Sequence, residues 1–235
     1  MFSKDVSTTH RTDGRQPHQL PPGRHGLPRS FVAQNQRERI LAAVADVASA
    51  ASYAEMTVED IIVTAGISRR TFYEHYKNKD EAFLAAYDAV TAQLAERVVA
   101  AIEAEEGMAR RARAGLGAFL DFVASEPAFA RLGIVEVLAA GPEAIRRRND
   151  TMRAFAALIE SDARELLGDD APPELTAETI VGGIYEVVYT RVLKGQLRDL
   201  PSLLPDLTYS ALLPYLGPEA AEAERQEAEA ALAPD

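Results

Sequence analysis

The segment from residue 57 to residue 79 contains two helix starts that lie close together, and it limits the fold more than any other part of the chain. Thr57 and Asp60 have the spacing of an N-cap and its partner, and Gly66 is a typical helix end. Ser68 follows two residues later and is a second N-cap. Two helices joined by so short a turn must meet at a steep angle, as they do in a helix-turn-helix.

Apolar residues on either side of this segment repeat with the period of an α-helix. One apolar stripe runs through residues 34–52 and another through residues 78–98. The later segments are amphipathic as well, are separated by Gly and Pro, and show no alternation typical of β-strands. The sequence therefore predicts an all-α protein, with a three-helix helix-turn-helix domain in residues 33–80 and a larger helical domain in residues 81–216.

The two ends of the chain differ in composition from the predicted domains. Residues 1–32 are rich in Pro, Gly, Gln and Thr with scattered Arg, which is typical of a flexible basic arm. Arg24 and Arg29 could enter a minor groove, or the arm could be a tail without a role. Residues 217–235 are rich in Ala and Glu without a sustained apolar stripe, which predicts a solvated or fraying helix.

The side-chain inventory offers little for catalysis. The chain has no Cys, and of its four His residues only His75 lies in a segment predicted to fold. Catalytic triads, His-ligated metals and most general-base mechanisms need an imidazole in a packed cleft. The sequence contains neither Glu-x-x-His nor Gly-x-Ser-x-Gly, and Gly115-Leu-Gly117 lacks the third glycine of a dinucleotide loop. We predict no catalytic residues, no metal and no cofactor.

The net charge of −11 is unevenly distributed along the chain. Residues 1–80 carry eleven Lys or Arg against nine Asp or Glu, whereas the remainder carries fourteen against twenty-seven. The N-terminal part can therefore meet phosphate even though the whole chain is acidic. No run of about 18 apolar residues and no signal peptide is present, which predicts a cytoplasmic protein without a membrane partner.

Side chains of the predicted helix-turn-helix separate onto two faces. Arg69, Arg70 and Tyr73 project from one face of the second helix, at positions i, i+1 and i+4. A short helix of this kind fits the major groove, where Arg can read guanine and an aromatic ring can touch the thymine methyl group. Tyr76 is expected in the core. The other core residues are Val58, Ile61, Ile62, Ala65, Ile67 and Phe72.

The same segment resembles the DNA-binding signature of the tetracycline-repressor (TetR) family. The resemblance covers about residues 36–83 and rests on the Thr/Asp start, the Ala-Gly-Ile-Ser turn, the Thr-Phe-Tyr core and the following Lys79. The chain departs from the family at Ile62, where a small residue is common, and at Ala51-Ser52-Tyr53, which replaces the usual Gly. Both departures bear on helix packing and neither removes a contact residue.

The resemblance implies particular roles for the second helix. Arg70, Thr71, Tyr73 and His75 would contact bases or phosphates, and Lys79 would bind a phosphate at the start of the next helix. Taken from the residues alone, two alternatives stay open. Arg69 is either a DNA contact or a solvated charge, and His75 is either a backbone contact or a surface polar group.

The resemblance also implies that the larger domain binds an effector and joins two subunits. In the family, a ligand pocket lies among the middle helices and the last two long helices form the dimer. Asp121 and Glu186 could favour a cationic ligand near the pocket, although a solvated helix face is the alternative. The candidate pocket residues are Phe119, Phe122, Met152, Phe155, Tyr185 and Tyr189. The candidate interface residues are Ile184, Val188, Leu204, Leu207 and Leu212, and ordinary helices buried in a monomer are the alternative reading.

These observations predict a ligand-responsive transcriptional regulator. The resemblance implies a repressor that occupies double-stranded operator DNA as a homodimer and is released by an unknown small molecule. One alternative is a DNA-binding or architectural protein without an effector. The other is an enzyme built on a helical bundle, which would need paired carboxylates or an acid with a His on facing helices.

Overall fold

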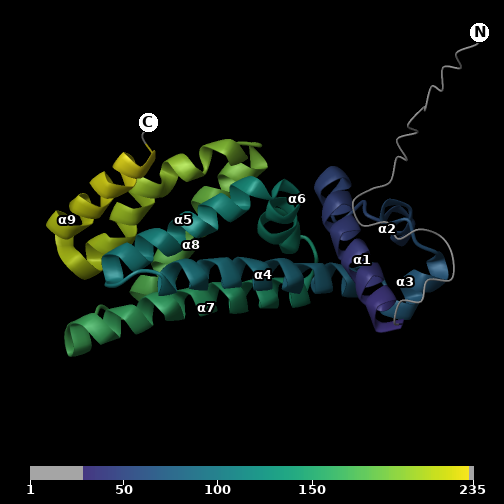
Figure 1. Cartoon of the computed structure of the whole chain (residues 1–235), viewed down its shortest axis with the longest axis horizontal. Coiled ribbons are helices and arrows are strands. Elements are labelled where there is room, and N and C mark those ends of the chain that lie inside the picture. The colour runs from purple at the N-terminus through teal and green to yellow at the C-terminus, as the bar shows by residue number, and fades with distance from the viewer. Residues whose placement is uncertain (1–28, 233–235) are drawn as a thin grey trace, which may run out of the picture.

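The computed structural model describes residues 29–232, and this part of the chain folds into helices without a strand, which confirms the predicted all-α class. A small N-terminal bundle lies at one end of an elongated molecule, and a larger bundle makes up the rest (Figure 1). The small bundle contains α1 (Arg29–Ala51), α2 (Val58–Ala65) and α3 (Arg69–His75), and α4 (Lys79–Glu103) runs from it into the larger bundle.

Local interactions explain why α2 and α3 begin and end where they do. The Thr57 hydroxyl accepts a hydrogen bond from the Asp60 N–H, and the Asp60 carboxylate accepts one from the Thr57 N–H at 3.0 Å. The Thr57 hydroxyl also donates to the Asp60 carboxylate at 2.6 Å, and this bond together with the one from the Thr57 N–H lowers the pKa of Asp60 below its usual value of 3.8. Gly66 ends α2 with φ 61°, a conformation that favours glycine, and Ser68 caps α3 through the Thr71 N–H.

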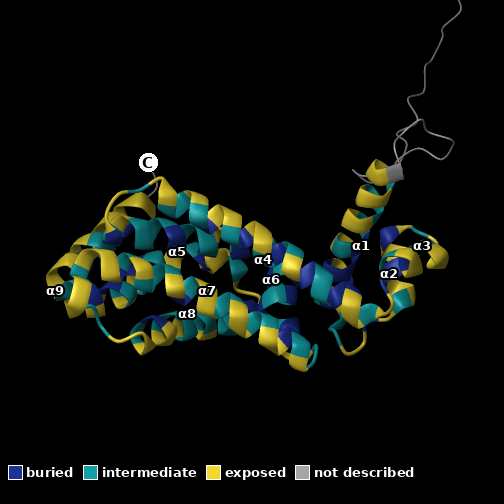
Figure 2. Ribbon diagram, turned by 90° about the horizontal axis from the view of Figure 1, so that it is seen from below, coloured by how far each residue is buried: buried dark blue, intermediate teal, exposed yellow. Residues whose placement is uncertain are grey.

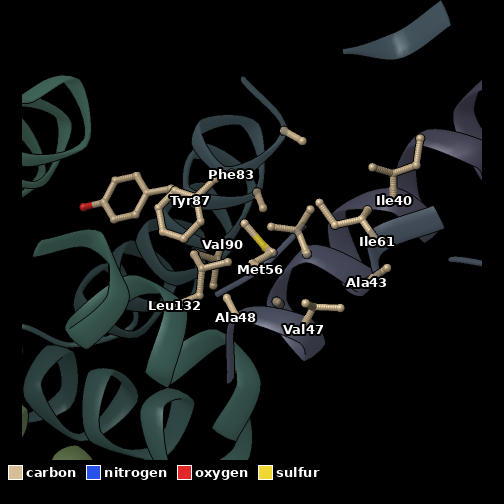
Figure 3. Packing of buried hydrophobic residues seen from close by; sticks show 14 of the residues in the cluster. Ile40, Ala43, Val47, Ala48, Met56, Ile61, Phe83, Tyr87, Val90 and Leu132 are labelled. Carbon is tan, nitrogen blue, oxygen red and sulfur yellow. The ribbon is translucent and has the colours of Figure 1, made fainter. Parts of the chain in front are cut away.

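The small bundle has a core that continues into the larger one. Ile40, Met56 and Ile61 are buried between α1 and α2, and Phe83 closes the same cluster from the start of α4 (Figure 3). Leu132, from the larger bundle, is buried in this cluster as well. The two parts therefore share packed side chains, and a change in one can be transmitted to the other.

The larger bundle is built from long helices joined by short ones (Figures 1 and 2). Its long helices are α5 (Met108–Ser125), α7 (Pro142–Leu167), α8 (Leu175–Leu193) and α9 (Leu204–Leu232). Between α5 and α7 the chain forms α6 (Pro127–Ala130), a π-helical turn η1 (Arg131–Val135) and a 3₁₀ turn η2 (Glu136–Leu138). Further 3₁₀ turns are η3 (Gly168–Asp170), η4 (Leu197–Asp199) and η5 (Pro201–Leu203). None of the helices described is both long and apolar enough to cross a membrane.

Both predicted chain ends differ from the structure. The backbone is already helical at Arg29, within the predicted arm of residues 1–32, whereas Arg24 lies outside the described residues. The described part of the predicted tail is helical, as expected, but it is not fully solvated, because α9 continues beyond a kink at Gly217 and buries Ala221 and Ala228 completely. Small Ala side chains let the helix approach its neighbour closely, so this contact leaves no large apolar stripe in the sequence.

Candidate DNA interface and effector cavity

The polar face predicted for the second helix is exposed on α3. The Arg70 side chain is 86% exposed and forms an ion pair with Glu74 one turn later, at 2.9 Å. Arg69 is also exposed and lies 3.6 Å from Glu59. Tyr73 is half exposed, with its ring edge against Phe72. Exposed ion pairs of this kind contribute little to stability, so the two guanidinium groups can exchange their carboxylates for phosphate or a base.

Buried contacts hold α3 in place beneath this face. Phe72 is fully buried, and Tyr76 is buried as predicted. The Arg39 guanidinium reaches from α1 to the turn between α2 and α3 and donates hydrogen bonds to the carbonyls of Ala65 and Gly66. These carbonyls end α2, so Arg39 satisfies groups that the helix leaves unpaired. No local pattern in the sequence marks Arg39, because its partners lie 26 and 27 residues away along the chain.

Thr71 and His75 are less available than the three residues that form the exposed face. Both are partly buried. The Thr71 hydroxyl lies 2.8 Å from the Ser68 hydroxyl, within the cap of α3. The His75 Nε2 lies 3.4 Å from the Gln36 amide oxygen and so connects α3 with α1. Their predicted contacts with DNA stay a prediction.

Lys79 has a structural role that its position in the sequence does not indicate. Its ammonium group donates hydrogen bonds to the carbonyl oxygens of Tyr53 and Met56, each at 3.0 Å, and lies 4.7 Å from the centre of the Tyr53 ring. The side chain thereby closes the loop between α1 and α2. The predicted phosphate contact stays a prediction, and it would compete with these carbonyls for the ammonium donors.

A buried carboxylate connects the small bundle to the larger one. Glu136 in η2 is 4% exposed, accepts a hydrogen bond from the Tyr53 N–H at 2.8 Å, and pairs with Arg131 at 3.1 Å. The Tyr53 hydroxyl donates to Asp80 at the start of α4. Burial and the Asp80 carboxylate raise the pKa of Tyr53 well above its usual value, so the phenol keeps its proton.

A cavity of about 190 Å³ lies inside the larger bundle. It extends along α4 from Tyr87 to Ile102 and is closed by α5, α6, α7, α8, α9 and η1. Its lining is almost entirely apolar, as is typical of a small-molecule site. The structure brings together five of the six predicted pocket residues on its wall, namely Phe119, Phe122, Met152, Phe155 and Tyr185. The sixth, Tyr189, lies outside the lining and stacks on Tyr185.

The charged residues of the cavity wall are basic, whereas the sequence led us to expect acidic ones. Asp121 and Glu186 are exposed and do not line the cavity. Arg111 and Arg148 line it instead, and the buried Thr208 hydroxyl on its wall has no hydrogen-bond partner among the described residues. The predicted preference of this cavity for a cationic ligand is therefore not supported, because no acidic side chain lines its described wall.

The helix-turn-helix segment matches a known protein family. The model for bacterial regulatory proteins of the tetR family matches residues 40–86, which run from α1 through the helix-turn-helix into α4. The helix-turn-helix part of this chain is that of the TetR family. The resemblance drawn from residues 57–79 is thereby confirmed.

Relatives and solved structures extend this similarity over most of the chain. The HTH-type transcriptional regulator EthR of Mycolicibacterium smegmatis is 29% identical over 179 residues, which cover 74% of this chain and 80% of EthR. The fatty acid degradation regulator FadR of Bacillus halodurans has a similar fold, with a TM-score of 0.68 at 16% identity over 75% of this chain and 94% of FadR. The structure of FadR from Bacillus subtilis, solved in complex with stearoyl-CoA, has a TM-score of 0.66 at 18% identity. The match covers 77% of this chain and 98% of that FadR.

The predicted dimer residues fall into two groups, those buried within the subunit and those partly exposed. Val188 and Leu212 are fully buried within the subunit, so a partner subunit could not reach them, and their assignment to an interface is wrong. Ile184, Leu204 and Leu207 are partly buried. Ile184 and Leu207 line a surface groove between α8 and α9. The other residues of this groove are Pro173, Leu175, Thr176, Thr179, Ile180, Gly183, Val187, Ser210, Ala211 and Pro214.

Proposed function

We propose that the protein is a ligand-responsive transcriptional repressor, which binds operator DNA in the cytoplasm as a homodimer and releases it when an effector occupies the cavity. The observation that carries this proposal is the face of α3, where Arg69, Arg70 and Tyr73 are exposed above the buried Phe72. A rigid short helix with this face can enter the major groove. The complex of Bacillus subtilis FadR with stearoyl-CoA supports a ligand role for the cavity by analogy.

The groove between α8 and α9 is the surface we assign to the second subunit. It is mainly apolar, and Leu175 at its edge is 69% exposed. Within the described part of the chain, no atom beyond the local helix backbone lies within 4 Å of the position that a Cβ would occupy at Gly183, so a partner helix can approach closely there. Two copies related by a twofold axis would present two α3 helices to two half-sites.

The position of η1 and η2 supports a route from the cavity to the DNA-binding face. Gly133 and Ile134 of η1 line the cavity, and the Ile134 carbonyl accepts a hydrogen bond from Tyr185 at 2.6 Å. Glu136 follows two residues later and holds Tyr53 in the small bundle. An effector that prefers another position of this turn would shift α1 and α3, and would lower operator affinity by its differential affinity for the two states.

Binding to the DNA that flanks the protein's own gene tests the regulator proposal. We expect tight binding to this DNA relative to random duplex, and a loss of about 1–3 kcal/mol for Arg70→Ala and for Tyr73→Ala because base contacts disappear. Titrations at two salt concentrations separate base contacts from phosphate contacts. Arg198→Ala, which removes an exposed Arg of η4 far from α3, is the matched control. Equal affinity for all duplexes would contradict the proposal.

The dimer surface has a test of its own. We expect Gly183→Arg to convert the protein to a monomer, because a buried guanidinium would lie in the apolar interface, while the subunit itself has room for the side chain. Operator affinity should fall together with the dimer, because two half-sites can no longer be bound at once. Analytical ultracentrifugation measures the mass. The control variant Ala100→Arg, at an exposed position of α4, should keep the mass of the wild-type dimer. A wild-type protein with the mass of a monomer would contradict the proposed dimer.

A further inference from the structure

We propose that the effector is a linear apolar molecule with an anionic group, and that Arg148 binds this group inside the cavity. The inference rests on the proposed function, because it assigns the chemistry of the molecule that the cavity takes.

The charge on Arg148 has no counter-ion in the part of the chain that the structure describes. Among the described residues it forms no ion pair, although Arg147 beside it pairs with Asp88. Its guanidinium carbon lies 3.9 Å from the centre of the Tyr185 ring, and its Nε is buried without a hydrogen-bond partner in this part of the chain. Its Nη1 donates to the Asn149 amide oxygen at 2.9 Å, a neutral acceptor that does not balance the charge.

The charge on Arg148 is therefore available to a ligand. An arginine keeps its charge in a protein, and a poorly solvated charge without a partner is unfavourable. An anion that entered the cavity would satisfy both the charge and the free Nε donor of Arg148.

The other charged residue of the cavity wall does not compete for the same ligand. Arg111 forms two hydrogen bonds with the Asp162 carboxylate, at 2.8 and 3.0 Å, so its charge is neutralised by the protein. Neither a carboxylate nor an imidazole lines the described cavity. The free charge of this cavity is thus a single positive one, which favours an anion and disfavours a cation.

The groups next to Arg148 suit an anion as well. Tyr87 and Thr151 line the cavity beside it, and the Tyr87 hydroxyl lies 3.3 Å from the Thr151 hydroxyl. Burial raises the pKa of Tyr87 and of Tyr185, so both phenols stay protonated and neutral, and the Tyr185 proton is donated to the Ile134 carbonyl. No group in this set carries a negative charge that would repel the ligand.

The shape of the cavity favours an unbranched chain. Its lining follows α4 from Tyr87 to Ile102, a rise of roughly 22 Å at about 1.5 Å for each residue. Its volume of about 190 Å³ is nevertheless below the roughly 300 Å³ at the lower end of ligand pockets. A cavity this long and this small is narrow, and a linear alkyl chain is the apolar group that fits it.

Three ligands with the same ten-carbon chain test the proposal. Decanoate, 1-decanol and decylamine are titrated below their micelle-forming concentrations, with calorimetry or the shift in Tm as the readout. We expect decanoate to bind about tenfold or more tightly than either other ligand, and Arg148→Leu to remove that preference while leaving decanol binding in place. Decyl phosphate as a fourth ligand distinguishes a carboxylate-selective site from a general anion site, and preference for either anion supports the proposal.

Control variants keep the result interpretable. Arg148→Lys retains the charge and should retain part of the preference for decanoate, and Arg146→Leu, an exposed neighbour with its own ion pair, should behave as the wild type. Equal binding of decanoate and decanol, tighter binding of decylamine, or binding of none of the ligands would overturn the proposal. Selective operator binding in the absence of ligand would show in each of these cases that the regulator proposal itself still stands.

Discussion

Replacing Phe72 with alanine is expected to lower the free energy of unfolding by about 3–5 kcal/mol and to abolish selective operator binding. Phe72 is fully buried in the shared core, and it is the buried residue through which α3 attaches to the bundle. The helix has only 7 residues, which is too short to be stable without tertiary contacts. Removing the ring leaves a cavity and frees the exposed face of Arg69, Arg70 and Tyr73 from its fixed orientation.

Chemical denaturation of Phe72→Ala and Phe31→Ala measures this effect. Phe31 is 51% exposed near the start of α1, so its replacement removes the same ring from a position with little burial and should cost less than about 1 kcal/mol. A similar small loss for Phe72→Ala would mean that α3 does not depend on its buried ring. Operator binding is measured on the folded fraction of each variant, so that loss of affinity is not confused with loss of protein.

Replacing Glu136 with alanine is expected to lower the free energy of unfolding by about 2–4 kcal/mol. The change leaves the Tyr53 N–H and the Arg131 guanidinium without their common acceptor at a site where water is largely excluded. It also removes the hydrogen bond that holds the small bundle to η2. We therefore expect the two bundles to unfold in a less cooperative manner, with a broader thermal transition than in the wild type.

Two further variants show whether the carboxylate or only its volume matters. Glu136→Gln keeps the size but has one acceptor oxygen in place of two, so it should satisfy one donor and lose about half of the effect. Glu227→Ala, at an exposed position of α9, should change stability by less than about 0.5 kcal/mol. Calorimetry measures both. A Glu136→Ala protein as stable and cooperative as the wild type would remove the basis for the coupling route through η2.

The sequence predicted those features whose causes lie within a few residues of each other. The cap at Thr57, the turn at Gly66 and the second cap at Ser68 depend on hydrogen bonds across three or four positions, and all of them are present. The exposed face of α3 follows from helical periodicity over the same short distance. Large side chains on predicted core faces, five aromatic residues and Met152, were also enough to identify part of the cavity wall, since five of these six residues line it.

The sequence did not predict Arg148, because a run of three arginines is usually a solvated helix face. A weak signal was nevertheless present, since Arg148 lies four residues before Met152 and so falls in phase with the apolar stripe that continues through Phe155 and Ile159. Periodicity places the side chain on the inner face of α7. It cannot show that the other helices bring no carboxylate to meet it.

By itself, then, the sequence determined the all-helical class, the helix-turn-helix and the polar face that we assign to DNA, because each depends on contacts between neighbours in the chain. Only the tertiary structure decided which of those side chains are free. Lys79 binds the carbonyls of a loop that is distant in sequence, and Val188 and Leu212 are buried within the subunit. The alanine-rich end of α9 packs on the bundle. These outcomes depend on residues that are far apart in sequence, and their partners are set by how the helices pack.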